Sequence, residues 1–114
     1  MRFLFQPKKI RLSDALRESL QLRIRFALSR FSERIREVAV TLDDVNGPRG
    51  GIDKRCQVEL RTQGAGPVVV ASVAGDWRTA LDNALARAAR FLMRLWRRGS
   101  DSRRMRQRFI GHEG

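Results

Sequence analysis

The spacing of apolar residues along this chain of 114 residues limits its fold more than any single motif. In residues 13–32 and 76–98, apolar side chains recur every three or four positions, as on the buried face of a helix. Around residues 38–42, 56–60 and 68–73 they alternate with polar ones or run together over the length of a strand. Phe3–Phe5, ahead of Pro7, is a further short strand candidate. The predicted order is β-α-β-β-β-α.

Strands of alternating polarity need one covered face and one face in water. Two amphipathic helices can supply the cover, so we expect an α+β domain with both helices packed on one face of a four-stranded sheet. The first strand–helix–strand unit fits a right-handed crossover between parallel neighbours. The Gly/Pro clusters at residues 46–51 and 64–67 are predicted to be turns between strands.

Capping residues set the expected ends of the two helices. Ser13 and Asp76 are predicted N-caps, and Gly99 is predicted to stop the second helix after Arg98. The buried stripe of the second helix is expected to consist of Trp77, Leu81, Ala84, Leu85, Ala88, Phe91, Leu92 and Leu95. Residues 1–98 should therefore form a single domain and residues 99–114 a basic, flexible tail.

Composition excludes several functions. Cys56 is the single cysteine and His112 the single histidine, so a disulfide framework, a zinc cluster and a His-centred catalytic site are not expected. The acids are scattered and form no acid–base or nucleophile–base couple. Cys56 is in register with the apolar residues of its strand and is predicted to be buried. The sequence predicts a protein that is not an enzyme and has no cofactor or metal. With no apolar run long enough to span a membrane and no secretory signal, a soluble, cytoplasmic protein is expected.

The basic charge points to a polyanionic partner. The formal net charge is +12, and residues 84–110 contain nine Arg and one acid. On the second helix, opposite the apolar stripe, five guanidiniums fall within roughly 100° of the helix circumference. They belong to Arg87, Arg90, Arg94, Arg97 and Arg98. Because no acid compensates their mutual repulsion, we expect them to bind phosphate, which the planar guanidinium fork suits.

Weaker candidates lie elsewhere. Arg23 and Arg30 flank the apolar stripe of the first helix and could extend the basic surface. Arg49 and Lys54 lie in a loop rich in Gly and basic residues, where backbone N–H groups could approach a phosphate. Leu22 and Phe26 form an apolar pair on the face away from the core. For this pair two interpretations are open: a contact with a partner, or cover by the tail.

The combination of these segments resembles the ribosome hibernation-promoting factor family, also called protein Y or ribosome-associated inhibitor. The resemblance spans about residues 2–98 and depends on four segments in this order. They are residues 12–18 (LSDALRE), 38–44 (VAVTLDD), 46–56 (NGPRGGIDKRC) and 80–92 (ALDNALARAARFL). The middle of the first helix, residues 22–27, departs from the family pattern. Residues 99–114 are basic and lack the C-terminal dimerisation domain of long members, so a short form is expected.

The resemblance implies a fold related to double-stranded-RNA-binding domains. It also implies binding to small-subunit rRNA at the decoding channel of the ribosome, where the domain would overlap mRNA and tRNA and silence idle ribosomes. Arg87, Arg90 and Arg94 match basic positions of the family's second helix. One alternative is an RNA-binding module or RNA chaperone acting off the ribosome. Another is a peripheral membrane or protein-interaction domain that uses the basic helix with Leu22 and Phe26.

Overall fold

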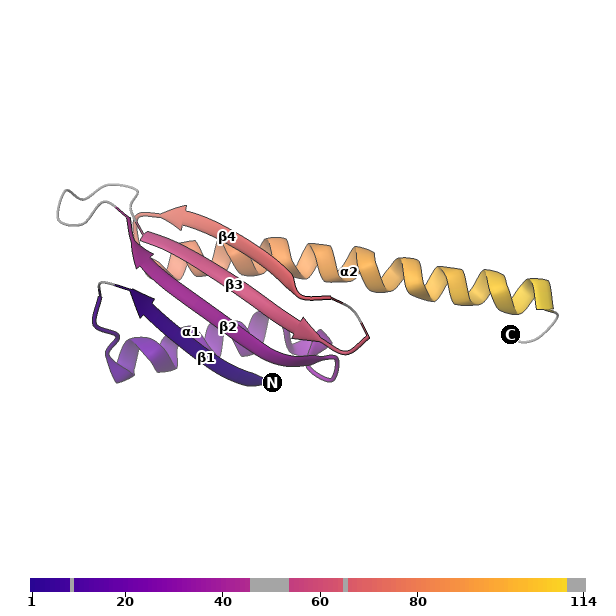
Figure 1. The fold of residues 1–114 in the computed structure, drawn as a ribbon, viewed down its shortest axis with the longest axis horizontal. Coiled ribbons are helices and arrows are strands. Elements are labelled where there is room, and N and C mark those ends of the chain that lie inside the picture. The colour runs from indigo at the N-terminus through magenta and orange to yellow at the C-terminus, as the bar shows by residue number, and fades with distance from the viewer. Residues whose placement is uncertain (9, 46–53, 65, 111–114) are drawn as a thin grey trace.

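The computed structural model describes residues 1–8, 10–45, 54–64 and 66–110, with side chains as far as Trp96. These residues form two α-helices, a short 3₁₀ helix and four strands (Figure 1). The bounds are Arg2–Lys8 (β1), Asp14–Ala27 (α1), Ser29–Phe31 (η1), Ile35–Asp44 (β2), Lys54–Thr62 (β3), Val68–Ala74 (β4) and Trp77–Ile110 (α2). The order of helices and strands predicted from the apolar spacing is confirmed.

The four strands of the described chain form a mixed sheet in the order β1-β2-β3-β4. β1 runs parallel to β2, with Phe3 opposite Val38, whereas β2–β3 and β3–β4 are antiparallel. A parallel pair needs a crossover connection, and α1 provides it. Both helices lie behind the sheet in Figure 1, so the predicted α+β arrangement with one covered face is confirmed. We call the opposite face of the sheet the outer face.

A continuous apolar core lies between the sheet and the helices. The sheet contributes chiefly Val38, Val40, Leu42, Cys56, Val58 and Leu60, and the helices Leu20, Ile24, Leu28, Ala80, Leu81, Ala84, Leu85, Ala88 and Leu92. The prediction that Cys56 is buried is confirmed. Burial raises the pKa of its thiol to about 12, because the thiolate is poorly solvated among apolar neighbours.

Helix α1 begins as predicted and ends earlier than predicted. Ser13 is the N-cap, and its Oγ accepts a hydrogen bond from the backbone N–H of Leu16 at 3.1 Å. The α-helix ends at Ala27, because Leu28 adopts φ −110° and ψ 15° and so leaves the helical region. The 3₁₀ turn η1 follows, and it still carries Phe31 into the core, where the apolar spacing had placed it.

Helix α2 is longer than predicted. Asp76 caps it, accepting hydrogen bonds from the backbone N–H and hydroxyl of Thr79 at 2.8 and 2.9 Å, and these bonds lower the pKa of Asp76. The helix then continues for 34 residues to Ile110, a length of about 51 Å. The prediction that Gly99 ends the helix is wrong. A glycine inside a helix costs about 1 kcal/mol relative to alanine. The second half of α2 extends past the sheet (Figure 1).

Two residues of the predicted α2 stripe are not in the core. Phe91 is 43% exposed, so the prediction that it is buried is wrong, and Leu95 is only half-buried and not part of the core cluster. Ala80, outside the predicted stripe, is fully buried. Phe91 follows Arg87 by one turn, and the Arg87 side chain reaches the edge strand β4 at Ala71. This side of α2 therefore lies at the border of the sheet, where no further strand covers a large ring.

Helices α1 and α2 lie side by side and parallel. Arg78 Nε donates a hydrogen bond to Ser19 Oγ at 3.2 Å, and Arg23 forms an ion pair with Asp82. Arg23 is four positions beyond Ser19 in α1, and Asp82 is four positions beyond Arg78 in α2. Because four residues make about one turn, both helices advance in the same direction along the contact.

Charged residues of opposite sign alternate on the outer face of the sheet. Two rows across β1, β2 and β3 read basic–acidic–basic, namely Arg2–Glu37–Arg61 and Lys8–Asp43–Arg55. In the first row Arg61 Nε lies 3.5 Å from Glu37 Oε2, and Arg61 Nη2 lies 3.4 Å from Glu59 Oε2. The basic residues of this face are thus placed beside carboxylates.

Candidate nucleic-acid interface

The predicted basic face of α2 is exposed as far as its side chains are described. Arg87, Arg90 and Arg94 are all exposed, and at 100° per residue they fall within about 60° of the helix circumference. We call these three residues the arginine stripe. They lie opposite the buried residues Leu85 and Leu92, so the apolar contacts that hold α2 on the sheet also direct the stripe into solvent.

One member of the arginine stripe is anchored to the sheet. Arg87 Nη1 donates a hydrogen bond of 2.8 Å to the carbonyl oxygen of Ala71 in the edge strand β4. Since a guanidinium has five N–H donors, this bond fixes the direction of the side chain and leaves donors for an anion. No sequence pattern indicates this contact, because it depends on how α2 packs beside β4.

The arginine stripe has no carboxylate partner. Among residues 1–96, as far as the structure describes them, no ion pair joins Arg87, Arg90 or Arg94 to an acid. On the outer face of the sheet, by contrast, Arg61 contacts two glutamates. The stripe therefore combines repelling positive charges with full access to solvent. Such a surface is suited to an external anion such as an RNA phosphate.

The two candidates on the first helical segment differ. Arg23 forms an ion pair with Asp82 of α2, and the two side chains are 39% and 49% exposed. It therefore joins the two helices as well as adding to their surface. Arg30 lies in η1, is exposed, and lines a hollow of about 300 Å³ with Trp96 and Glu33. Of the two, Arg30 has the freer side chain for an external phosphate.

Of the remaining predicted site residues, Lys54 contacts other residues of the chain, and the others lie wholly or in their side chains outside the described part. Lys54 Nζ lies 2.8 Å from Asp44 Oδ2 and 5.7 Å from the centre of the Trp77 ring, so its charge already has internal partners. Arg49 lies in residues 46–53, outside the described part of the chain. Arg97 and Arg98 lie within the bounds of α2, but their side chains are outside the description.

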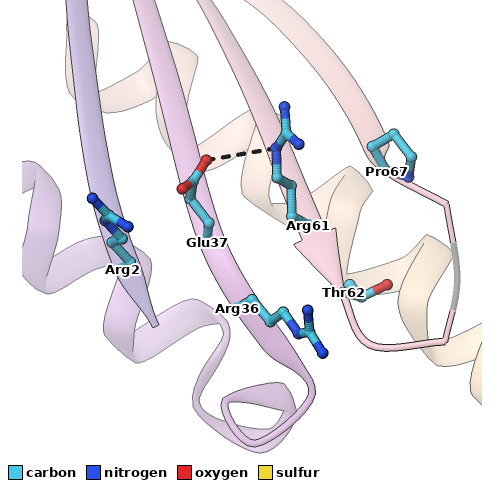
Figure 2. Close-up of a pocket in the computed structure, with 6 residues that line it drawn as sticks. All are labelled: Arg2, Arg36, Glu37, Arg61, Thr62 and Pro67. Atoms are coloured by element: carbon cyan, nitrogen blue, oxygen red, sulfur yellow. Dashed lines mark ion pairs between the residues drawn. The ribbon is translucent and has the colours of Figure 1, made fainter.

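A hollow of about 400 Å³ lies on the sheet, away from all these residues. It is lined by Arg2, Arg36, Glu37, Arg61, Thr62 and Pro67 (Figure 2). An irregularity in the β2–β3 register between Ile35 and Glu37 places both Arg36 and Glu37 opposite this end of β3. Figure 2 shows the ion pair of Glu37 with Arg61 inside the hollow, whereas the guanidiniums of Arg2 and Arg36 point apart. The hollow thus lacks the convergent donors that would hold an anion.

No helix in the described part of the chain has the length and apolar character needed to cross a membrane. Groups of three or more His, Cys, Asp or Glu side chains placed to hold a metal ion are absent from the same residues.

Leu22 and Phe26 are exposed, as their position away from the core stripe predicts. Leu22 is 67% exposed and Phe26 is 87% exposed. They border an open groove of about 700 Å³ between the helices, which we call the helix groove. It is lined by Ser19, Leu22, Arg23, Phe26, Ala27 and Asp82. Sequence reasoning did not find this groove. Ser19 and Arg23 are four positions apart in α1, as Arg78 and Asp82 are in α2. This equal spacing is the sequence signal that could have predicted that the two helices lie side by side.

Comparisons with known proteins agree with this architecture. A ribosomal subunit interface protein from Coxiella burnetii has a TM-score of 0.68 and 14% sequence identity, covering 83% of this chain and 97% of that one. The Protein Y N-terminal domain of Thermus thermophilus has a TM-score of 0.67 and 21% identity, covering 83% of this chain and 99% of that one. At these identities the likeness establishes the fold. A search of curated protein sequences finds no match.

Residues 4–99 match the family model described as "Sigma 54 modulation protein / S30EA ribosomal protein". The matched segment includes β1 from Leu4 onward, the other three described strands, α1 and the first part of α2, and with it the whole arginine stripe. The chain therefore belongs to the sigma 54 modulation protein / S30EA ribosomal protein family, a family of ribosome-associated proteins.

Proposed function

We propose that this protein binds small-subunit rRNA at the decoding channel of the ribosome and blocks the path of mRNA and tRNA. The observation that carries the proposal is the arginine stripe of α2, whose three exposed guanidiniums have no carboxylate partner among the described residues. Membership of a ribosome-associated family and likeness to a protein named for the ribosomal subunit interface support the ribosome as the source of the phosphate.

The proposed mechanism is steric and includes no catalysis. Arg87, Arg90 and Arg94 donate hydrogen bonds to phosphate oxygens, and Arg30 adds a contact from the other helical segment. The four-stranded sheet behind the helices gives the domain a rigid body. Once phosphate contacts hold this body in the channel, mRNA and tRNA are excluded from the same volume. Such a protein acts in the cytoplasm, where ribosomes work.

The ribosome is preferred over a free RNA target for a structural reason. The described surface offers phosphate-binding groups and a rigid shape. No described strand carries the row of exposed aromatic residues that sheet-based readers of single-stranded RNA use. A surface of this kind recognises the position of phosphates in a folded RNA, and ribosomal RNA presents such positions in a fixed arrangement.

Co-sedimentation with purified small ribosomal subunits tests the proposal. The variant R87E/R90E/R94E should no longer sediment with the subunits, because three attractive contacts become repulsive. The matched control is R2E/R36E/R61E, which changes the net charge equally on the outer face of the sheet and should still bind. Both variants should retain the far-UV circular dichroism of the parent, since all six side chains are exposed.

Competition then tests the position on the subunit. Small subunits already carrying mRNA and tRNA should exclude the protein. If the protein binds equally well to filled and empty subunits, it does not occupy the decoding channel, and an RNA-binding role elsewhere becomes the better explanation. Equal binding by R87E/R90E/R94E and the parent would refute the role of the arginine stripe.

A further inference from the structure

The helix groove contains the most exposed aromatic ring of the described chain. Phe26 is 87% exposed and follows Leu22, which is 67% exposed, by one turn of α1. The buried stripe of α1, represented by Leu20 and Ile24, faces the opposite way, so Leu22 and Phe26 do not pack in the core. Among the described residues nothing covers either side chain.

The groove beside this ring has fixed walls. On one side, the ion pair between Arg23 and Asp82 joins the two helices. At the end of α1, the Ser29 hydroxyl donates a hydrogen bond of 3.2 Å to the carbonyl oxygen of Phe26, which ties down the turn that carries the ring. The backbone at Phe26 is therefore held in place, while its ring is almost wholly in solvent.

Charge decides what can occupy the groove. Inside it the charges of Arg23 and Asp82 cancel. Beside it, Arg30 is exposed and directly follows Ser29, whose hydroxyl contacts the Phe26 carbonyl oxygen, and no carboxylate of the described chain forms an ion pair with Arg30. A purely apolar partner would have to cover this guanidinium without neutralising it, which is costly. A nucleotide brings a flat apolar base together with a phosphate.

We propose that Phe26 is a stacking platform for an unpaired base of the bound RNA, with Leu22 extending the platform and Arg30 holding the adjacent phosphate. The inference rests on the proposed function, since it assumes that RNA lies along the helices. It adds a preference that the arginine stripe cannot provide. Phosphate contacts do not distinguish paired from unpaired RNA, whereas stacking on an exposed ring requires a base that has left its helix.

The test compares two RNA hairpins and four variants by fluorescence anisotropy at one fixed salt concentration. One hairpin has a perfectly paired stem, and the other has the same stem interrupted by unpaired adenosines. F26A and F26L should bind the interrupted hairpin roughly 5- to 150-fold more weakly than the parent, the range expected for loss of one stacked base. Their affinity for the paired hairpin should be unchanged. F26W should restore the preference. The fluorescence it adds to that of the parent, which contains Trp77 and Trp96, should be quenched by the interrupted hairpin alone.

The fourth variant, V69A, is the control, because Val69 is an exposed apolar residue on the outer face of the sheet and should change neither affinity. Full binding of the interrupted hairpin by F26A overturns the proposal. Equal losses on both hairpins overturn it too, since the ring would then have no preference for an unpaired base. If F26A binds both hairpins normally but loses binding to whole small subunits, Phe26 contacts a ribosomal protein instead.

A different set of results would refute the proposed function. If R87E/R90E/R94E still binds both hairpins and the small subunit, the arginine stripe is not the phosphate-binding surface, whatever F26A does. If that triple variant loses all binding and F26A retains the full preference for unpaired RNA, the proposed function stands and the stacking platform is wrong.

Discussion

The number of phosphates bound by the arginine stripe can be counted from the salt dependence of ribosome binding. Each phosphate neutralised by a basic side chain lowers the slope of log K against log salt by roughly 0.7–0.9. Replacing Arg87, Arg90 and Arg94 by glutamine removes three charges that have no carboxylate partner among the described residues. The slope for the triple glutamine variant should therefore be less steep than that of the parent by about 2.1–2.7.

The measurement is a binding isotherm on small ribosomal subunits at several potassium chloride concentrations. Single variants should each change the slope by about 0.7–0.9, because the three guanidiniums act on separate phosphates. The control is R61Q, which removes the same charge from a side chain that already contacts Glu37 and Glu59. If R61Q changes the slope as much as R90Q does, binding responds to net charge alone and the assignment of phosphate contacts to α2 is refuted.

Three further predictions concern the fold itself. L81A should lower the free energy of unfolding by about 2.7–5 kcal/mol, because Leu81 is fully buried under the sheet; a loss below about 1 kcal/mol in urea denaturation would contradict that burial. Cys56 should resist thiol reagents in the native protein at pH 8 and react on unfolding. Because its folded pKa of about 12 exceeds the ordinary value of 9.0, stability should fall as pH rises above 9, and less so in C56A; a native thiol that reacts at the unfolded rate would contradict this. G99A should strengthen the helical signal in far-UV circular dichroism, since Gly99 lies within α2, whereas a weaker signal would mean that Gly99 ends the helix.

Periodicity predicted the helices and strands well because burial of one face creates both the sequence pattern and the structure. Val38, Val40 and Leu42 alternate with residues of the outer face because the sheet has one covered face, and all three are buried. The exposure of the arginine stripe follows from the same logic, since residues opposite a buried stripe must face water. The parallel pairing of β1 with β2 could also be predicted from the sequence, because a helix separates these strands in the chain.

The predictions that failed depended on the borders of packed elements. Phe91 satisfies the helical period but lies where the sheet ends, and no sequence pattern marks the width of a sheet. Glycine often ends helices, yet whether Gly99 does so depends on whether the backbone leaves the helical conformation there, and α2 continues to Ile110. The contacts of Lys54 with Asp44 and Trp77 were not predictable from the sequence, because they depend on a strand pairing and a helix position that bring distant side chains together.

The alternating charges on the outer face of the sheet have a consequence for how the molecule moves. Carboxylates are interleaved with basic residues on that face, while the arginine stripe on α2 has none, so positive potential is concentrated on the helical side. The described part of the protein is therefore an electric dipole. In the field of a large polyanion such a dipole rotates during diffusion, before any contact forms. Most encounters then begin with the helices already facing the polyanion. This orientation raises the association rate, and the association rate falls as the ionic strength increases.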